Sequence, residues 1–469
     1  MIQPAKKFKN ALQSCAAYLD RPDVFRQNVL VVLGIAIVLR LAILGLFWSD
    51  WTWQSGHVHD NWDKLAVNLV ESGTFGFEPD KPTVIRAPLF PLFEIPIYQL
   101  FGLDYRLWSL TLLAFDVLVC AMLILLGRRA WGQRAALLAG LFYAIHLALI
   151  YYTARIEQFV VSLPLVFLWL YFYTRIEKRP RAKWLAFSLG LVCGLLMINK
   201  SVYLPAPFLA AGALIWARRT KISLRTRVSN AAIVLVTAAA IVAPWTVRNY
   251  VVTGGRIIPV QSLLAYQFFL DVQWDELDAQ EGTHRPDFSH WNKIYTRQMS
   301  FIAENEKLSH PNLTGVQREL MEEDICREML LPWIKNHPAQ LISKSIKNMW
   351  QFWFGAENFR KTSLFYLLQF FYLGLSLFGT YHLFKNRSLS NLGIGVLLIL
   401  ALWAEHSLVY AMGRHSMDLI PILALLFGLG TDVWLRRLQE ENRDANFLEN
   451  DTLRNTGTTR NRTSKELTC

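Results

Sequence analysis

Long apolar segments are the feature that most constrains how this chain can fold. A helix needs about 20 mostly apolar residues to cross the hydrocarbon core of a bilayer. Of the 469 residues, 53% are hydrophobic and 18% are charged, which is too apolar for two soluble domains of this length. Apolar runs, several of them short for a span, recur at 29–48, 107–126, 135–151, 159–173, 184–198, 202–216, 231–247, 364–384, 392–412 and 419–434. We therefore predict an all-α polytopic membrane protein with about ten transmembrane helices.

Basic residues in alternate connections predict the orientation of these segments. Lys and Arg cluster before the first segment and after the second, fourth, sixth, eighth and last. Since cytoplasmic loops are enriched in Lys and Arg, both termini are expected in the cytoplasm. The net charge of +12 follows from this topology and does not require a nucleic-acid partner. The expected organisation is a cytoplasmic segment 1–28, a transmembrane domain 29–435 and a disordered cytoplasmic tail 436–469.

Two long connections, 49–106 and 248–363, then fall on the outer face. Within the first, residues 60–72 have apolar side chains at helical spacing, which predicts an amphipathic helix lying in the membrane interface. The apolar residues of that helix are Trp62, Leu65, Ala66, Leu69 and Val70. A similar apolar face, with Lys residues off it, lies between 341 and 353 in the second connection. We expect interfacial juxtamembrane helices in both outer loops.

An acidic cluster follows the first apolar segment, just outside the membrane. Asp60 and Asp63 belong to this cluster. An acid held at this position is where an enzyme that moves groups from a lipid carrier would need a base. A carboxylate at the start of a helix also serves as a cap, and this alternative stays open for Asp60. A further alternative is that His57, His59 and Asp60 hold a divalent metal such as Zn²⁺, Mn²⁺ or Mg²⁺; no cofactor is otherwise required.

Charged and polar residues also stand at the outer ends of several apolar segments, where basic residues are disfavoured. They are Arg155, Glu157, Lys200, Arg248, Arg414, His415 and Asp418, with Glu405 and His406 about two turns inside the ninth segment. Polar groups near hydrocarbon are costly and usually face a cavity or one another. Local pairing explains any single one, for instance Arg155 with Glu157. The whole set predicts a site for an outward-facing anionic ligand, and a lipid phosphate fits best. Arg40, within the first segment, is expected to pair with another buried polar group such as Asp116.

Four motifs occur along the chain in a fixed order. After the acid that opens the first outer loop come LAVNLVESGTFGF at 65–77 and RAPLFP at 86–91. APWTVRNY at 243–250 closes the seventh segment, and RHSMDLIP at 414–421 opens the last. This order resembles the membrane-embedded C-type glycosyltransferases, in particular the dolichyl-phosphate-mannose–protein mannosyltransferase-like group, whose superfamily also holds the lipid A aminoarabinose transferases. The likeness extends from the first apolar segment to about Leu435.

The resemblance implies an inverting displacement at the anomeric carbon of a sugar that is linked to polyprenyl phosphate. The family's acid corresponds to Asp60, which would take the proton from the acceptor hydroxyl. Many relatives have a second acid directly after it, whereas here Asn61 follows, so the role of Asp63 stays open. Fixed cations would stabilise the developing charge on the leaving phosphate. The candidates are Arg86, Arg155, Lys200, Arg248 and Arg414. The acceptor would be a glycolipid, a cell-envelope polymer or a protein hydroxyl.

Two other functions stay open. A transporter or flippase of an anionic lipid or sugar would also use outward-facing cations, although it would not require an acid at Asp60. A glycan polymerase or ligase with a diphosphate-linked donor would share the topology and differ in the carrier. The expected partners are membrane lipids, a polyprenyl-phosphate-linked sugar and its acceptor. The expected location is the bacterial inner membrane, with the active site facing the periplasm.

Overall fold

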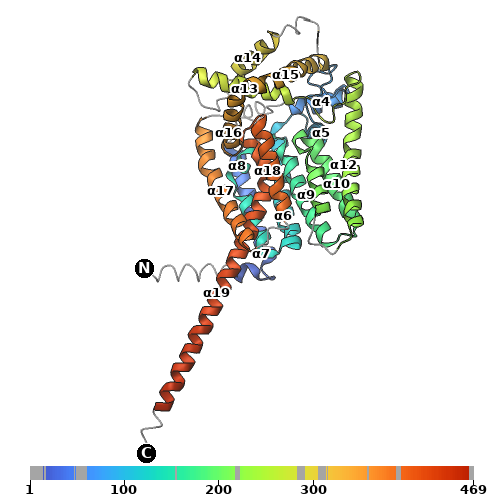
Figure 1. Cartoon of the computed structure of the whole chain (residues 1–469). Helices are drawn as coiled ribbons and strands as arrows, with labels where there is room; N and C mark the ends of the chain where they lie inside the picture. Colours follow the sequence, from blue (N-terminus) through green and yellow to red (C-terminus); the bar gives the residue numbers. More distant parts are fainter. Residues whose placement is uncertain are drawn as a thin grey trace, which may run out of the picture.

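The computed structural model describes residues 14, 17–46, 48, 61–153, 156–216, 222–281, 291–304, 313, 315–355, 359–386 and 392–463. Within these ranges the chain is helical apart from turns and loops, with one isolated β-bridge between Glu78 and Lys81. Long helices form a bundle, and a layer of helices covers one end of it (Figure 1). The predicted all-α fold is confirmed for the described part of the chain.

The helices of the bundle coincide with the apolar segments of the sequence. They are α2 (Phe25–Leu46), α6 (Tyr105–Trp131), α7 (Gln133–Ala144), α8 (Leu147–Thr153), α9 (Phe159–Lys178), α10 (Lys183–Asn199), α11 (Ala206–Trp216), α12 (Leu224–Val252), α17 (Phe359–Lys385), α18 (Gly393–Leu408) and α19 (Ile420–Thr463). Among the described residues, six helices are long and apolar enough to cross a membrane, and four more are apolar but shorter. The chain is therefore an integral membrane protein, as the hydropathy pattern predicts.

One predicted span, 135–151, is divided into α7 and α8. The hydroxyl of Tyr372, from α17, donates to the carbonyl oxygen of Ile145 at 2.5 Å and accepts from the amide of Leu147 at 3.3 Å. A side chain that inserts in this way replaces helical partners of the backbone. The break therefore depends on a distant helix, which periodicity within 135–151 does not report.

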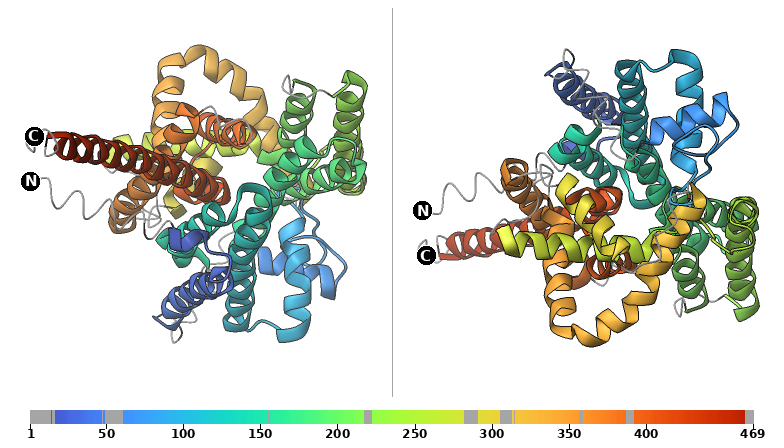
Figure 2. Two further views of the ribbon diagram at one scale, coloured as in Figure 1. Left: turned by 90° about the horizontal axis from the view of Figure 1, so that it is seen from below. Right: turned by 90° about the horizontal axis from the view of Figure 1, so that it is seen from above.

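The covering layer contains the helices of both predicted outer loops, and we call this end of the bundle the loop end. Its helices are α4 (Trp62–Glu71), α5 (Leu89–Phe101), α13 (Leu264–Glu281), α14 (Trp291–Ala303), α15 (Val316–Asn336) and α16 (Pro338–Phe354). Figure 2 shows them from above, lying across the ends of the bundle helices. The amphipathic helix predicted at 60–72 is confirmed as α4, with Trp62 and Leu65 buried.

The apolar face predicted at 341–353 is exposed along α16. Ile342 and Ile346 are 61% and 62% exposed, which suits a helix that lies against lipid. Lys344, which the sequence places off this apolar face, is buried. Its ammonium group lies 2.9 Å from the carboxylate of Asp271 in α13, and the pair ties α16 to the rest of the loop end.

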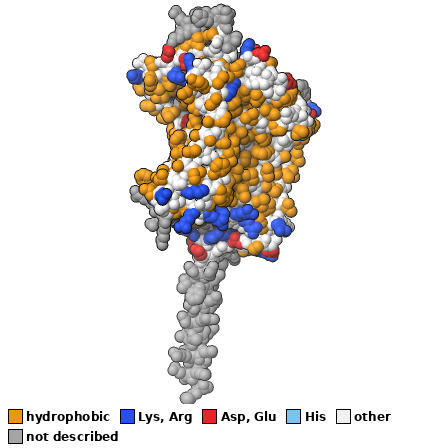
Figure 3. Space-filling view, turned by 90° about the vertical axis from the view of Figure 1, so that its right-hand side faces the viewer, with side chains coloured by type: hydrophobic (Ala, Val, Ile, Leu, Met, Phe, Trp, Pro, Cys, Tyr) orange, Lys and Arg blue, Asp and Glu red, His pale blue; other side chains and the backbone are white. Residues whose placement is uncertain are grey.

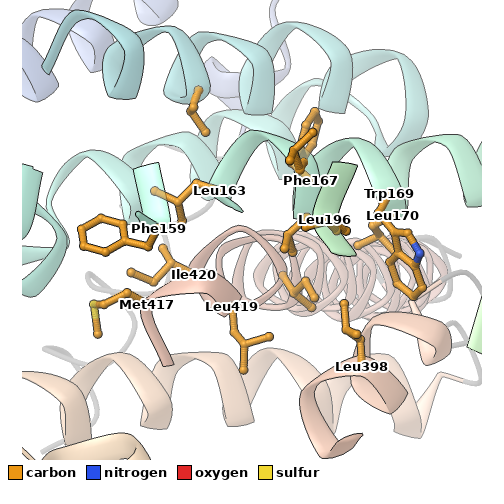
Figure 4. Close-up of a cluster of buried hydrophobic side chains, with 14 of the residues drawn as sticks. Phe159, Leu163, Phe167, Trp169, Leu170, Leu196, Leu398, Met417, Leu419 and Ile420 are labelled. Atoms are coloured by element: carbon orange, nitrogen blue, oxygen red, sulfur yellow. The ribbon is translucent and has the colours of Figure 1, made fainter. Parts of the chain in front are cut away.

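Close packing at glycines, a buried ion pair and an apolar cluster hold the bundle together. Glycines let α10 and α12 approach closely: a Cβ at Gly190 would lie 2.7 Å from the carbonyl oxygen of Val234. Arg40 of α2 pairs with Asp116 of α6, which confirms the expected partner of this mid-segment charge. Figure 4 shows the apolar cluster where α9, α10, α18, α19 and the 3-10 helix η4 (Gly413–Leu419) meet, including Phe159 and Met417.

The surface between the two ends is apolar. Figure 3 shows a broad belt of hydrophobic side chains, with Lys and Arg gathered below it, at the end of the bundle opposite the loop end. Two basic residues lie in the last turn of α6 and two in that of α9. This distribution agrees with the positive-inside argument, and the sidedness itself stays a prediction.

The last helix differs from the expectation of a disordered tail at 436–469. Helix α19 continues to Thr463. No proline follows Pro421, and the first glycine after Gly430 is Gly457, so the sequence in between has no strong helix breaker.

Candidate functional site

A cavity of about 370 Å³ opens at the loop end of the bundle. Its walls come from segments far apart in the sequence: the start of α4, the loop before α5, the start of α9, the loop after α10, the loop before α13, the end of α18 and the 3-10 helix η4 (Gly413–Leu419). Four residues predicted from the sequence line it together: Arg86, Lys200, Arg414 and His415. The structure therefore gathers three of the predicted cations around one hollow.

Arg86 reaches the cavity from the loop that joins α4 to α5. Its guanidinium lies 5.4 Å from the ring centroid of Trp62 and 5.8 Å from that of Phe77. Both contacts are cation–π interactions, which hold the side chain without neutralising its charge. Trp62 also lines the cavity, so the start of α4 and Arg86 form one wall.

Lys200 is placed by the end of α10. Asn199 before it is buried and donates to the hydroxyl of Ser162 at 2.7 Å, while Gln158 donates to the carbonyl oxygen of Asn199. The ammonium group of Lys200 donates to Asp418 of η4 at 2.8 Å. This pair joins two walls of the cavity, and the Lys200 side chain keeps 20% of its surface exposed.

Arg414 projects from η4 and lies 3.9 Å from Glu157, which is 7% exposed. The position of η4 depends on a glycine contact. The amide of Gly413 donates to the carbonyl oxygen of Gly355 at 2.7 Å, and a Cβ at Gly413 would lie 2.3 Å from that oxygen. A side chain at this position would push η4 away from the end of α16.

Arg248 was expected to face the ligand, and the structure places it elsewhere. Its guanidinium donates to the carbonyl oxygens of Thr83 at 2.6 Å and Phe75 at 3.0 Å, and it is not among the residues that line the cavity. Glu319 of α15 binds the same segment, accepting from the Thr83 hydroxyl at 2.5 Å and the Val84 amide at 2.9 Å. Both residues therefore hold the loop from which Arg86 projects.

Asp63 is also away from the cavity. It is 8% exposed and accepts from the hydroxyl of Tyr105 at 2.6 Å, beneath α4. The sequence placed Asp63 off the apolar face of this helix, but α5 and α6 cover it. Glu94 of α5 is a nearby buried acid, and neither of its carboxyl oxygens has a hydrogen-bond partner among the described residues.

Four predicted site residues, His57, His59, Asp60 and Arg155, lie outside the described residues. The hypotheses of a base at Asp60 and of a metal at His57, His59 and Asp60 stay predictions. In the described part of the chain, no group of three or more His, Cys, Asp or Glu residues is arranged to hold a metal ion.

Besides the predicted cations and His415, the cavity is lined by Glu405 and His406, which the sequence had singled out as polar residues inside an apolar segment, and by residues that it missed. Glu405 and His406 enter it from α18, and Tyr410 follows them. Polar residues within an apolar segment are a signal for a site. Gln261 and Gln267 carried no such signal, because they lie in the long connection 248–363, whose path only the fold defines.

A second hollow lies beside the first, between α16, α17, α18 and α19. Its volume is about 1020 Å³, and most of its lining is apolar, including Trp353 and Trp403. Gly355 is one of the residues that line it, and its carbonyl oxygen accepts from the amide of Gly413, the residue before Arg414. The apolar hollow and the cation-lined cavity are therefore neighbours that share one backbone contact.

The sequence and the structure of this chain are similar to those of known membrane proteins. The family model described as dolichyl-phosphate-mannose-protein mannosyltransferase matches residues 80–247. No curated protein sequence matches the chain. The oligosaccharyltransferase AglB of Archaeoglobus fulgidus, in complex with an inhibitory peptide and a dolichol-phosphate, matches with a TM-score of 0.51 at 16% identity, over 89% of this chain and 51% of that one. Its apo form matches with a TM-score of 0.53 at 16% identity, over 90% and 52%.

This chain thus spans about half the length of the oligosaccharyltransferase chains that it matches. ArnT of Cupriavidus metallidurans, bound to undecaprenyl phosphate, is also similar, at 13% identity and a TM-score of 0.38 over 87% of this chain and 78% of that one. The family model is that of a mannosyltransferase, and it matches 168 of the 469 residues of this chain. The chain therefore has the fold of a membrane-embedded C-type glycosyltransferase and, over residues 80–247, the sequence pattern of the mannosyltransferase family, which confirms the resemblance inferred from its motifs.

Proposed function

We propose that this chain is an inverting glycosyltransferase that moves a sugar from a polyprenyl-phosphate donor to an acceptor hydroxyl at the outer face of the membrane. The observation that supports this most strongly is the convergence of Arg86, Lys200 and Arg414 on one cavity at the loop end. Three cations from separate segments suit the phosphate of such a donor, which has one negative charge while the sugar is attached and gains a second as the sugar leaves. In a partly buried site each of them stabilises a phosphate more than it would in water.

The apolar hollow beside the cavity supports a lipid-linked donor. A carrier with its phosphate against Arg414 would have its hydrocarbon next to Gly355, which lines the hollow between α16 and α19. The AglB structure with the same fold contains a dolichol-phosphate, which is a carrier of this chemical class. The donor in this proposal is therefore a monophosphate-linked sugar.

In the proposed reaction the acceptor oxygen attacks the anomeric carbon, and the bond from that carbon to the phosphate oxygen breaks. The electron pair of that bond leaves with the phosphate monoester, whose added charge faces Lys200 and Arg414. The proton of the acceptor hydroxyl goes to Asp60, two residues before the cavity residue Trp62 in the sequence. The proposed site faces the periplasm of a bacterial inner membrane, in line with the basic loops at the opposite end.

The test is transfer by the purified chain in lipid vesicles, with polyprenyl phosphates carrying mannose, glucose or 4-aminoarabinose. Mass analysis of envelope glycans from cells with and without the chain identifies the acceptor to supply. Asp60→Asn should lower transfer at least about 100-fold, as loss of a general base does, without changing the stability of the protein. Asp80→Asn, at an exposed position of the same loop, is the matched control and should be close to wild type.

The lipid that is released distinguishes the alternatives. Polyprenyl monophosphate is expected. Release of a diphosphate would indicate a polymerase or ligase, and movement of the lipid across the vesicle membrane without release of any phosphate would indicate a transporter or flippase. Near-normal transfer by Asp60→Asn would overturn the assignment of the base.

A further inference from the structure

Two histidines line the cavity in addition to its cations. His406 comes from α18 and His415 from η4, and their ring centroids are 4.5 Å apart with an interplanar angle of 42°. Phe352 packs 5.2 Å from the ring of His406, and Tyr410 lies 5.7 Å from that of His415. Aromatic neighbours on either side thus limit how far each ring can rotate.

Hydrogen bonds to the backbone fix which nitrogen of His415 has the proton. Its Nδ1 lies 3.2 Å from the amide nitrogen of Met412, and that amide must donate. Nδ1 therefore keeps its lone pair, so the ring is neutral and its proton is on Nε2. His415 consequently presents an N–H donor at Nε2.

His406 has the opposite arrangement. Its Nδ1 lies 2.8 Å from the carbonyl oxygen of Leu402, which can only accept, so the proton is on Nδ1. Burial of the ring, and then the nearby ammonium group of Lys200, disfavour a second proton on it, while Asp418 acts in the opposite direction. Glu405 is the acid that lines the cavity from the same helix. The Nε2 of His406 is then a hydrogen-bond acceptor.

Among the described residues, no hydrogen-bond partner faces either Nε2 atom. Neither atom is one of the fully buried polar atoms that lack a partner, so both can be reached by a ligand. One acceptor and one donor thus stand side by side in a cavity lined with positive charge. Phosphate oxygens only accept from such groups, whereas a sugar hydroxyl can donate. A sugar phosphate offers both kinds of group next to each other.

We infer that His415 and His406 bind the donor on either side of its sugar–phosphate bond. His415 donates from Nε2 to a phosphate oxygen, and the Nε2 of His406 accepts from a hydroxyl of the adjoining sugar. This inference rests on the proposed function and names the two contacts by which the site distinguishes a loaded carrier from an empty one. The two residues are specificity-determining contacts, and no proton has to leave either ring.

The experiment measures binding of two probes to the full-length chain in detergent: polyprenyl phosphate alone, and the sugar-bearing polyprenyl phosphate that wild type binds most tightly among those carrying mannose, glucose or 4-aminoarabinose. His415→Phe should weaken both probes about tenfold, since one hydrogen bond to a charged group is lost. His406→Phe should weaken only the sugar-bearing probe, by about the same factor. The difference between the probes is the readout that a purely structural role would not give.

Glutamine keeps a donor and an acceptor near the position of Nε2, so His406→Gln and His415→Gln should restore most of the affinity. His337→Phe, at the exposed start of α16, is the control and should bind both probes like wild type. Thermal unfolding of each variant shows whether it is folded.

Equal weakening of both probes by His406→Phe, or unchanged binding by His415→Phe, would overturn the inference while leaving the proposed function intact. Failure of wild type to bind either lipid would overturn the proposed function, and this inference with it.

Discussion

The guanidinium of Arg248, at the end of α12, donates to the main-chain oxygen of Thr83 at 2.6 Å. It also stacks on Trp245, with 4.8 Å between the guanidinium carbon and the ring centroid. Thr83 lies three residues before Arg86, whose side chain lines the cavity. Arg248 therefore acts on the cavity through the backbone of the first loop, and a direct contact with the ligand is not needed to explain its position.

Arg248→Ala should release this loop. We expect a loss of about 1–3 kcal/mol in the free energy of unfolding, because two buried carbonyl oxygens lose a charged donor. Donor affinity should fall, since Arg86 loses its fixed position. Thermal unfolding and lipid binding measure the two effects, and Arg256→Ala, which removes an exposed ion pair with Asp324, is the control.

Glu319→Ala should act on the same segment from the side of α15. Because Arg248 and Glu319 both hold Thr83, the double variant Arg248→Ala/Glu319→Ala should lose less stability than the sum of the two single variants. Strict additivity would show that the two residues hold the loop independently, contrary to this expectation.

Neutralising the cavity should slow transfer without unfolding the chain. Arg414→Gln should lower kcat/KM about 100-fold, a loss typical for a group that stabilises charge in the transition state. Lys200→Met should do the same, but it also leaves Asp418 without its partner, so some loss of stability is expected. The control is Lys178→Met, at the opposite end of the bundle. Unchanged kinetics for Arg414→Gln would show that the phosphate binds elsewhere.

Gly413→Ala tests whether the position of η4 matters. The added methyl group would lie 2.3 Å from the carbonyl oxygen of Gly355, so η4 must move and displace Arg414 and His415. We expect transfer to fall more than tenfold, together with a lower melting temperature. Gly393→Ala is the matched control, because no atom lies within 4 Å of the new methyl group there. That variant should be neutral or slightly more stable.

Glu94 should make stability depend on pH. Burial in the loop-end helix α5, and secondarily the nearby Asp63, raise the pKa of Glu94 well above its usual range. The folded state therefore favours the protonated acid. The contribution of Glu94 to the free energy of unfolding is fully present below the pKa that Glu94 has in the unfolded chain. It is lost as pH rises toward the pKa of Glu94 in the folded chain, at up to about 1.4 kcal/mol per pH unit.

Glu94→Gln should remove this dependence. The variant is expected to match wild type near pH 4 and to be the more stable of the two as pH increases. Thermal unfolding in detergent from pH 4 to pH 8 measures the difference, and Glu78→Gln, at an exposed position, should follow the wild-type curve. Parallel curves for wild type and Glu94→Gln would contradict the prediction.

Hydropathy and charge in the sequence were sufficient to predict the helices of the bundle, the amphipathic helix α4 and the pairing of Arg40 with Asp116. These features depend on local periodicity and on the cost of an unpaired charge in an apolar environment, which short segments already express. The same argument singled out Lys200 and Arg414 as residues at a site, because cations at that end of a span require a reason.

Only the tertiary structure decided which of these residues meet. Arg248 and Lys200 look alike in the sequence, each at the end of an apolar segment, yet one holds a loop and the other lines the cavity. The difference lies in contacts between residues more than 160 positions apart: Arg248 bonds to Thr83, and Lys200 bonds to Asp418. Lys344 and His406 were likewise defined by their distant neighbours in the fold, because burial and hydrogen-bond partners are properties of the packed chain and hydropathy along the sequence does not encode them.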